Sequence, residues 1–157
     1  MTRRLTNFSF GATSAIVTSL AFIVGLSRSI NPNLTIIGLL LLFAIADNIS
    51  DSLGIHIYQE SELKKTKVVI ASTFYNFLTR FLIVLSFILL VALLPIDYAV
   101  VVSIIYGISL LVILTYFIAK EEKVNPYKAI LWHVAIAILI IIVSNFIGMW
   151  IRNIFNV

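Results

Sequence analysis

Two carboxylates with helical spacing are the first residues in this chain that could do chemistry. Asp47 and Asp51 are four residues apart, so a helix would place both on one face. Asn48 lies beside them, and hard divalent cations such as Mn²⁺ and Fe²⁺ accept carboxylate and amide oxygens as ligands. Asp47 follows Leu34 by about 20 Å of helix, well inside a hydrocarbon layer roughly 30 Å thick. The segment from Asp47 to Asp51 is therefore the candidate functional site.

A carboxylate at that depth costs on the order of 2.5–3.5 kcal/mol. We therefore expect Asp47 to face water, protein or a cation, although it could also cap a neighbouring helix or hydrogen-bond Ser and Asn side chains. His56 could bind metal or carry a proton near the membrane boundary, or could be a simple interfacial residue. Glu60 and Glu62 could attract cations at an entrance, or could pair with the lysines from Lys64 onward.

Composition sets the class of protein that must position these groups. The chain has 157 residues, of which 61% are hydrophobic and 11% charged, and its mean hydropathy is +1.11. These values predict an all-α integral membrane protein with a single transmembrane domain over residues 1–157. The positive residues lie between apolar runs, which argues against nucleic acid as a partner. Cysteine is absent, so disulfides, thiolate metal sites and cysteine nucleophiles are excluded.

Five apolar runs predict five transmembrane helices, over about 8–26, 34–58, 76–94, 99–119 and 129–151. Turns are marked by Pro32, Pro95 and Pro126. Residues 68–75 could lie in the interface or could lengthen the third helix, in which Arg80 is expected to snorkel toward the headgroups. The chain contains no Gly-rich phosphate loop, HExxH pattern or nucleophile elbow, so we do not expect an enzyme.

Positive charge is distributed unequally between the two ends of this layout. Arg28 and Arg152 fall on one side, and nine positive residues fall on the other: Arg3, Arg4, Lys64, Lys65, Lys67, Arg80, Lys120, Lys123 and Lys128. Because short positive loops stay in the cytoplasm, the amino terminus is predicted to be cytoplasmic and the carboxyl terminus outside or lumenal. No small-residue cleavage pattern follows the first apolar run, which is therefore read as a retained helix.

Several spaced stretches resemble motifs of the vacuolar iron transporter family. Residues 10–19 (FGATSAIVTS) resemble its first-helix motif Phe-Gly-x-x-Asp-Gly-x-Val-Thr-Thr, and residues 46–54 (ADNISDSLG) match Ala-Asp-x-x-Ser-Met-x-x-Gly without a gap. Residues 61–62 match its Ser-Glu end, residues 92–95 (ALLP) resemble the end of its third helix, and residues 147–148 the end of its fifth. The resemblance therefore spans nearly the whole chain.

The resemblance implies a five-helix protomer that forms a homodimer, with the metal path between protomers. It implies a proton-coupled antiporter of Fe²⁺ or Mn²⁺, located in the cell membrane or a vacuole-like membrane, in which helix-two carboxylates bind the cation at the dimer interface. The expected partners are the bilayer, a second copy, the metal ion and protons. Small residues in the first helix allow close approach, so helices one and two are expected to form the dimer contact, with Ala15 and Ser19 in it.

Departures from the motifs leave a second possibility open. Ser14 stands where the family has a metal-binding Asp, and Asp51 stands where it has Met. The family's Gly-Glu-Tyr is replaced by Gly-Ile-His at residues 54–56, which end in His56, so the Glu of that motif is missing. The acidic insert between helices two and three is absent as well. A non-transporting dimeric scaffold or partner subunit is therefore the alternative to a transporter. The candidate metal-binding residues are Asp47, Asp51, Asn48, Ser14, His56, Glu60 and Glu62.

Asp47 and Asp51 are also expected to act together. Two carboxylates buried side by side without a partner repel each other. Replacing either one with Asn removes an intramembrane charge, so folding and membrane insertion are expected to be unharmed or improved.

Overall fold

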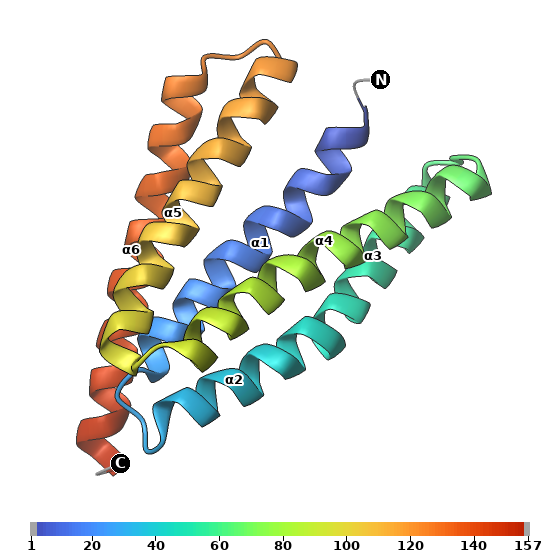
Figure 1. Cartoon of the computed structure of the whole chain (residues 1–157). Helices are drawn as coiled ribbons and strands as arrows, with labels where there is room; N and C mark the ends of the chain where they lie inside the picture. The colour runs from blue at the N-terminus through green and yellow to red at the C-terminus, as the bar shows by residue number, and fades with distance from the viewer. Residues whose placement is uncertain (1–2, 156–157) are drawn as a thin grey trace.

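The computed structural model describes the backbone of residues 3–155 and the side chains of residues 11–155. Within these residues the fold is entirely helical, as predicted (Figure 1). The elements in chain order are α1 (Arg3–Leu26), α2 (Pro32–Leu42), the π-helical turn η1 (Phe43–Asp47), α3 (Asn48–Ser61), α4 (Thr66–Leu93), α5 (Ile96–Glu121) and α6 (Pro126–Phe155).

The segment that holds the candidate site is one unbroken rod. The residues on either side of η1, Leu42 and Asn48, keep right-handed helical backbone angles, so α2, η1 and α3 follow one another without a turn. The predicted helix over 34–58 is therefore present and slightly longer, running from Pro32 to Ser61. A π turn contains one residue more than an α turn and often occurs at functional sites. Asp47 is the last residue of this turn.

The third predicted helix begins ten residues earlier than expected, at Thr66 instead of residue 76. Lys65 has extended backbone angles and marks the start, and residues 68–75 continue the helix instead of lying apart from it. Of the two possibilities left open by the sequence, lengthening of the third helix is the one observed. This shift moves Arg80 from near a helix end to the middle of α4.

Among the residues that the structure describes, four helical segments are long and apolar enough to cross a membrane, as in multi-pass membrane proteins: Pro32–Ser61, α4, α5 and α6. The apolar segment Gly11–Leu26 of α1 is shorter. Among the described side chains of α6, Ala137 alone is buried, so most of this helix faces away from the protein core.

Helix α1 lies in the middle of the bundle, between the α5–α6 pair and α4 (Figure 1). Its small residues allow this position, because Ala12, Ala15 and Ser19 are all fully buried within the one chain. The expectation that Ala15 and Ser19 meet a second copy is therefore wrong. Near the other end of α1, a Cβ added to Gly148 of α6 would overlap the backbone oxygen of Gly25, so the two helices cross at glycines.

Candidate functional site

Polar contacts join α3 and α4 at successive levels along their antiparallel packing. Gln59 Nε2 donates to Ser72 Oγ (2.8 Å), and Asn76 Nδ2 donates to Ser52 Oγ (3.3 Å). One turn deeper, Asn48 Nδ2 donates to the Phe77 carbonyl oxygen (2.9 Å). Lipid cannot hydrogen-bond polar side chains, so such side chains pair between membrane helices, and each of these bonds stabilises helix association by about 0.6 kcal/mol on average. We call this row of contacts the polar seam.

The deepest contacts of the polar seam are ionic. Arg80 of α4 donates through Nη1 to Asp51 Oδ2 (2.5 Å) and through Nη2 to Asp47 Oδ2 (2.6 Å). The Arg80 side chain is 2% exposed, so the expectation that it snorkels to the headgroups is wrong. Because α4 begins at Thr66, Arg80 lies about 21 Å along the helix, too deep to reach an interface by extending its side chain.

The π turn and α1 contact different parts of the Arg80 side chain. Arg80 Cζ lies 5.5 Å from the ring centroid of Phe43, the first residue of η1, which is a favourable cation–π distance. On the other side, a Cβ added to Gly11 of α1 would lie 3.0 Å from Arg80 Cγ and would overlap Asn76 Oδ1. Gly11 therefore lets α1 close over this part of the polar seam.

The two carboxylates are less enclosed than the arginine. The Asp47 side chain is 52% exposed and the Asp51 side chain is 27% exposed. Each of them gives Arg80 only its Oδ2 atom, and among the described side chains Oδ1 of each has no hydrogen bond. Two carboxylate oxygens, one from each acid, are therefore still able to accept a ligand while Arg80 stays in place.

Some buried polar atoms of the polar seam have no hydrogen-bond partner among the described residues. They are Asn48 Oδ1, Gln59 Oε1, Asn76 Oδ1 and Arg80 Nε. Buried polar groups are normally paired, because an unpaired one keeps its full desolvation cost of about 1–3 kcal/mol. All four atoms belong to α3 or α4, the two helices that the polar seam joins.

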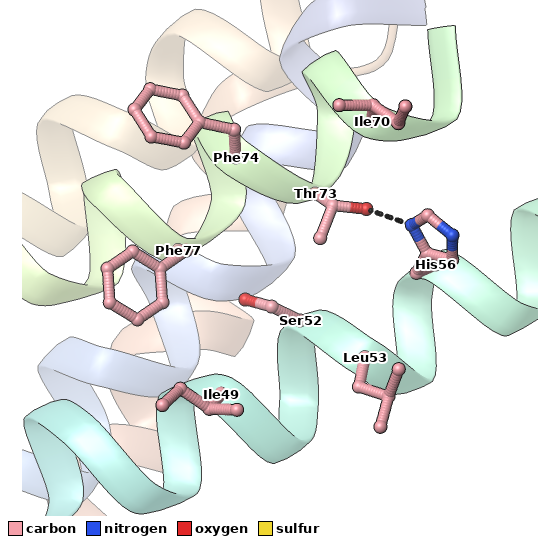
Figure 2. Close-up of a pocket in the computed structure, with 8 residues that line it drawn as sticks. All are labelled: Ile49, Ser52, Leu53, His56, Ile70, Thr73, Phe74 and Phe77. Atoms are coloured by element: carbon pink, nitrogen blue, oxygen red, sulfur yellow. Dashed lines mark hydrogen bonds between the residues drawn. The ribbon is translucent and has the colours of Figure 1, made fainter. Parts of the chain in front are cut away.

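His56 lies apart from the acid pair. Its Nδ1 is 3.1 Å from Thr73 Oγ1, and its Nε2 is 3.4 Å from Glu60 one turn later. His56 and Thr73 also line a pocket of about 450 Å³ between α3 and α4, whose other walls are mainly apolar (Figure 2). Neither Asp47 nor Asp51 lines this pocket, so the pocket and the acid pair are separate features.

The remaining predicted metal-binding residues are not brought to the acid pair. Glu62 pairs with Lys64 (2.6 Å) and accepts a hydrogen bond from Tyr58, so it belongs to a surface cluster at the end of α3. Ser14 is half-buried on α1, three residues beyond Gly11, and no hydrogen bond joins it to either acid. In the described part of the chain, no group of three or more His, Cys, Asp or Glu side chains is arranged to hold a metal ion.

The geometry adds a residue that the sequence reasoning did not place in the site. Asp47, Asp51 and Arg80 form one cluster with a formal charge of −1, in which both carboxylates pair with the one guanidinium of Arg80. The signal that could have found Arg80 was its position near the middle of the third helix, once the mixed residues 68–75 are taken as part of that helix. A bound cation would neutralise the remaining negative charge of this cluster.

No protein-family model, curated protein or solved structure matches this chain.

Proposed function

We propose that this chain is a transporter of a divalent cation, Fe²⁺ or Mn²⁺, coupled to protons, in which Asp47 and Asp51 bind the cation. The observation that supports this best is the exposure of Asp47, at 52%, in the middle of a helix able to cross a membrane. Both ends of that helix are about 21 Å or more from Asp47. A carboxylate held at this depth and left open to a ligand has a functional use more often than a structural one.

The cation is bound in this proposal by the free Oδ1 atoms of Asp47 and Asp51. Carboxylate oxygens suit Mn²⁺ and Fe²⁺, and the two acids come from one helix face, so they need no rearrangement to meet one ion. Two ligands do not complete the coordination of such an ion, and water or a second copy of the chain supplies the others. Asn48 is less suitable than expected, because its Oδ1 atom, which would bind the ion, is buried.

A homodimer fits the exposed face of the same helix. Asp47, Ser50 and Gly54 are exposed there, and polar side chains at this depth are disfavoured in contact with lipid. The contact then involves the rod formed by α2, η1 and α3, whereas α1 stays inside each protomer. Such a dimer brings the two Asp47 side chains toward one another across its axis.

The proposed function is tested by Mn²⁺ flux into liposomes that contain the purified protein. We expect saturable flux in the parent protein and at least a tenfold lower flux in Asp47→Asn, which keeps the side-chain shape and removes one charge. Glu62→Gln is the matched control, because it removes an acid from the surface cluster, and it should retain most of the flux. Equal flux in parent liposomes and protein-free liposomes would rule out transport.

A scaffold without transport activity is the second candidate function. It is favoured by the two ion pairs of Arg80, which already neutralise one of the two acidic charges. In that case Asp47 and Asp51 hold α3 to α4, and no divalent ion binds at millimolar concentration. The flux experiment separates the two functions, because only the transporter gives an Mn²⁺ signal that depends on Asp47.

The proposed orientation has five crossings, with the amino terminus in the cytoplasm. With Arg80 inside the bundle, eight positive residues remain on the cytoplasmic side against Arg28 and Arg152 on the other. The cysteine-free chain gives no labelling background. A cysteine at Ile30 in the α1–α2 turn should react with an impermeant maleimide from outside, and a cysteine at Glu122 after α5 should react only after permeabilisation. Labelling of both from the same side would contradict this topology.

A further inference from the structure

The guanidinium of Arg80 is buried, yet it occupies only some of the carboxylate oxygens of Asp47 and Asp51. It takes one oxygen from Asp47 and one from Asp51, and it leaves the second oxygen of each open. Its stem is packed against Gly11 and its charged end lies near the Phe43 ring, so it cannot swing to solvent without opening the α1–α4 contact. It is therefore a fixed positive charge beside the proposed cation site.

We infer that Arg80 limits the affinity of Asp47 and Asp51 for a divalent cation and so permits the ion to leave. This inference rests on the proposed function and gives Arg80 a role that is distinct from holding helices together. The two acids alone would offer a cation two negative charges, whereas the cluster with Arg80 offers one. Because Arg80 is 2% exposed, water screens its repulsion of a bound ion far less than at the surface.

The sign of the effect separates this role from a purely structural one. If Arg80 served only to orient the carboxylates, its removal would loosen them and weaken cation binding. If its charge limits affinity, its removal strengthens binding and slows release. The charge effect should dominate because Asp47 and Asp51 are four residues apart on a continuous helix, which keeps them together without Arg80.

The experiment is an Mn²⁺ titration of the purified full-length protein in detergent, combined with Mn²⁺ flux in liposomes. Arg80→Gln should bind Mn²⁺ at least tenfold more tightly than the parent, while its maximal flux at saturating Mn²⁺ falls. Arg80→Lys keeps the charge and should stay within about threefold of the parent Kd. Unchanged or weaker binding by Arg80→Gln would overturn the inference.

A second pair of variants keeps the test decisive if Arg80→Gln does not fold. Asp51→Asn has one acid and Arg80, whereas Asp51→Asn combined with Arg80→Gln has one acid and no arginine, so the pair isolates the same charge without leaving two unpaired carboxylates. The combined variant should bind Mn²⁺ at least tenfold more tightly than Asp51→Asn, and equal binding by the two would overturn the inference.

The outcomes also distinguish this inference from the proposed function. If the parent binds no Mn²⁺ but Arg80→Gln does, transport by the parent is excluded while the role of Arg80 as a limit on affinity stands. If the parent transports Mn²⁺ and Arg80→Gln binds it no more tightly, transport stands and the inference fails. If neither protein binds Mn²⁺, both are wrong.

Discussion

Replacing Asp47 and Asp51 together with Asn should lower the free energy of unfolding by about 3–5 kcal/mol, because Arg80 would remain charged and buried without a counterion. Each single replacement should leave the free energy of unfolding nearly unchanged, since the guanidinium keeps one carboxylate and the cluster changes from a charge of −1 to zero. The loss in the double variant should therefore exceed the sum of the two single losses. Unfolding in mixed micelles, followed by circular dichroism, measures all three.

A third substitution shows whether the unpaired arginine causes the loss. Adding Arg80→Leu to the double variant removes the stranded charge, and it should recover most of the lost stability, because apolar replacement of a whole buried ion cluster is often neutral or favourable. A double variant as stable as the parent would contradict the buried ion pairs. The expectation that replacing either acid alone leaves folding unharmed or improved stays a prediction, whereas for the double replacement the unpaired Arg80 predicts a loss of stability.

The second large effect is expected at the crossing of α1 and α6. Gly148→Ala should destabilise the fold by about 1–3 kcal/mol, because its new Cβ would overlap the backbone oxygen of Gly25 and force the two helices apart. A backbone atom cannot move aside as the end of a flexible side chain can. Thermal unfolding of the detergent-solubilised protein, monitored by circular dichroism, is the measurement.

Gly38→Ala is the matched control for that prediction. Gly38 lies inside α2, and an added Cβ there would have no atom within 4 Å. Alanine is the better helix former by about 1 kcal/mol, so this variant should be unchanged or slightly more stable. Similar destabilisation of Gly38→Ala and Gly148→Ala would mean that the close crossing is not the cause.

The sequence was sufficient to predict helices because apolar composition and proline turns act locally. Pro32, Pro95 and Pro126 each lie at or next to the start of a helix, as turn residues should. The four-residue spacing of Asp47 and Asp51 likewise predicted one shared face, and both acids do reach the same group. Such features depend on residues a few positions apart.

The partner of the acid pair was not predictable in the same way. Arg80 meets Asp47 through the antiparallel packing of α3 and α4, and that register depends on where α4 begins. The mixed residues before residue 76 do not indicate this start, so the sequence alone predicts Arg80 near a membrane boundary. The burial of Ala15 and Ser19 within the protomer was not predictable either, because small residues permit close packing without specifying which helix packs against them.

The π turn η1 has a consequence for insertions and deletions in this chain. Buried residues along the rod recur every fourth position, at Ile36, Leu40, Ala44, Asn48 and Ser52. A regular α-helix advances about 100° per residue, so a four-residue repeat drifts by about 40° at each step. The extra residue of η1 cancels much of that drift, so the buried residues before and after the turn lie on nearly the same face of the rod. Deleting Ile45 from this turn would retain the site residues but rotate α3 by about 100° relative to α2, so that the side chains of α3 would no longer face their partners on α4.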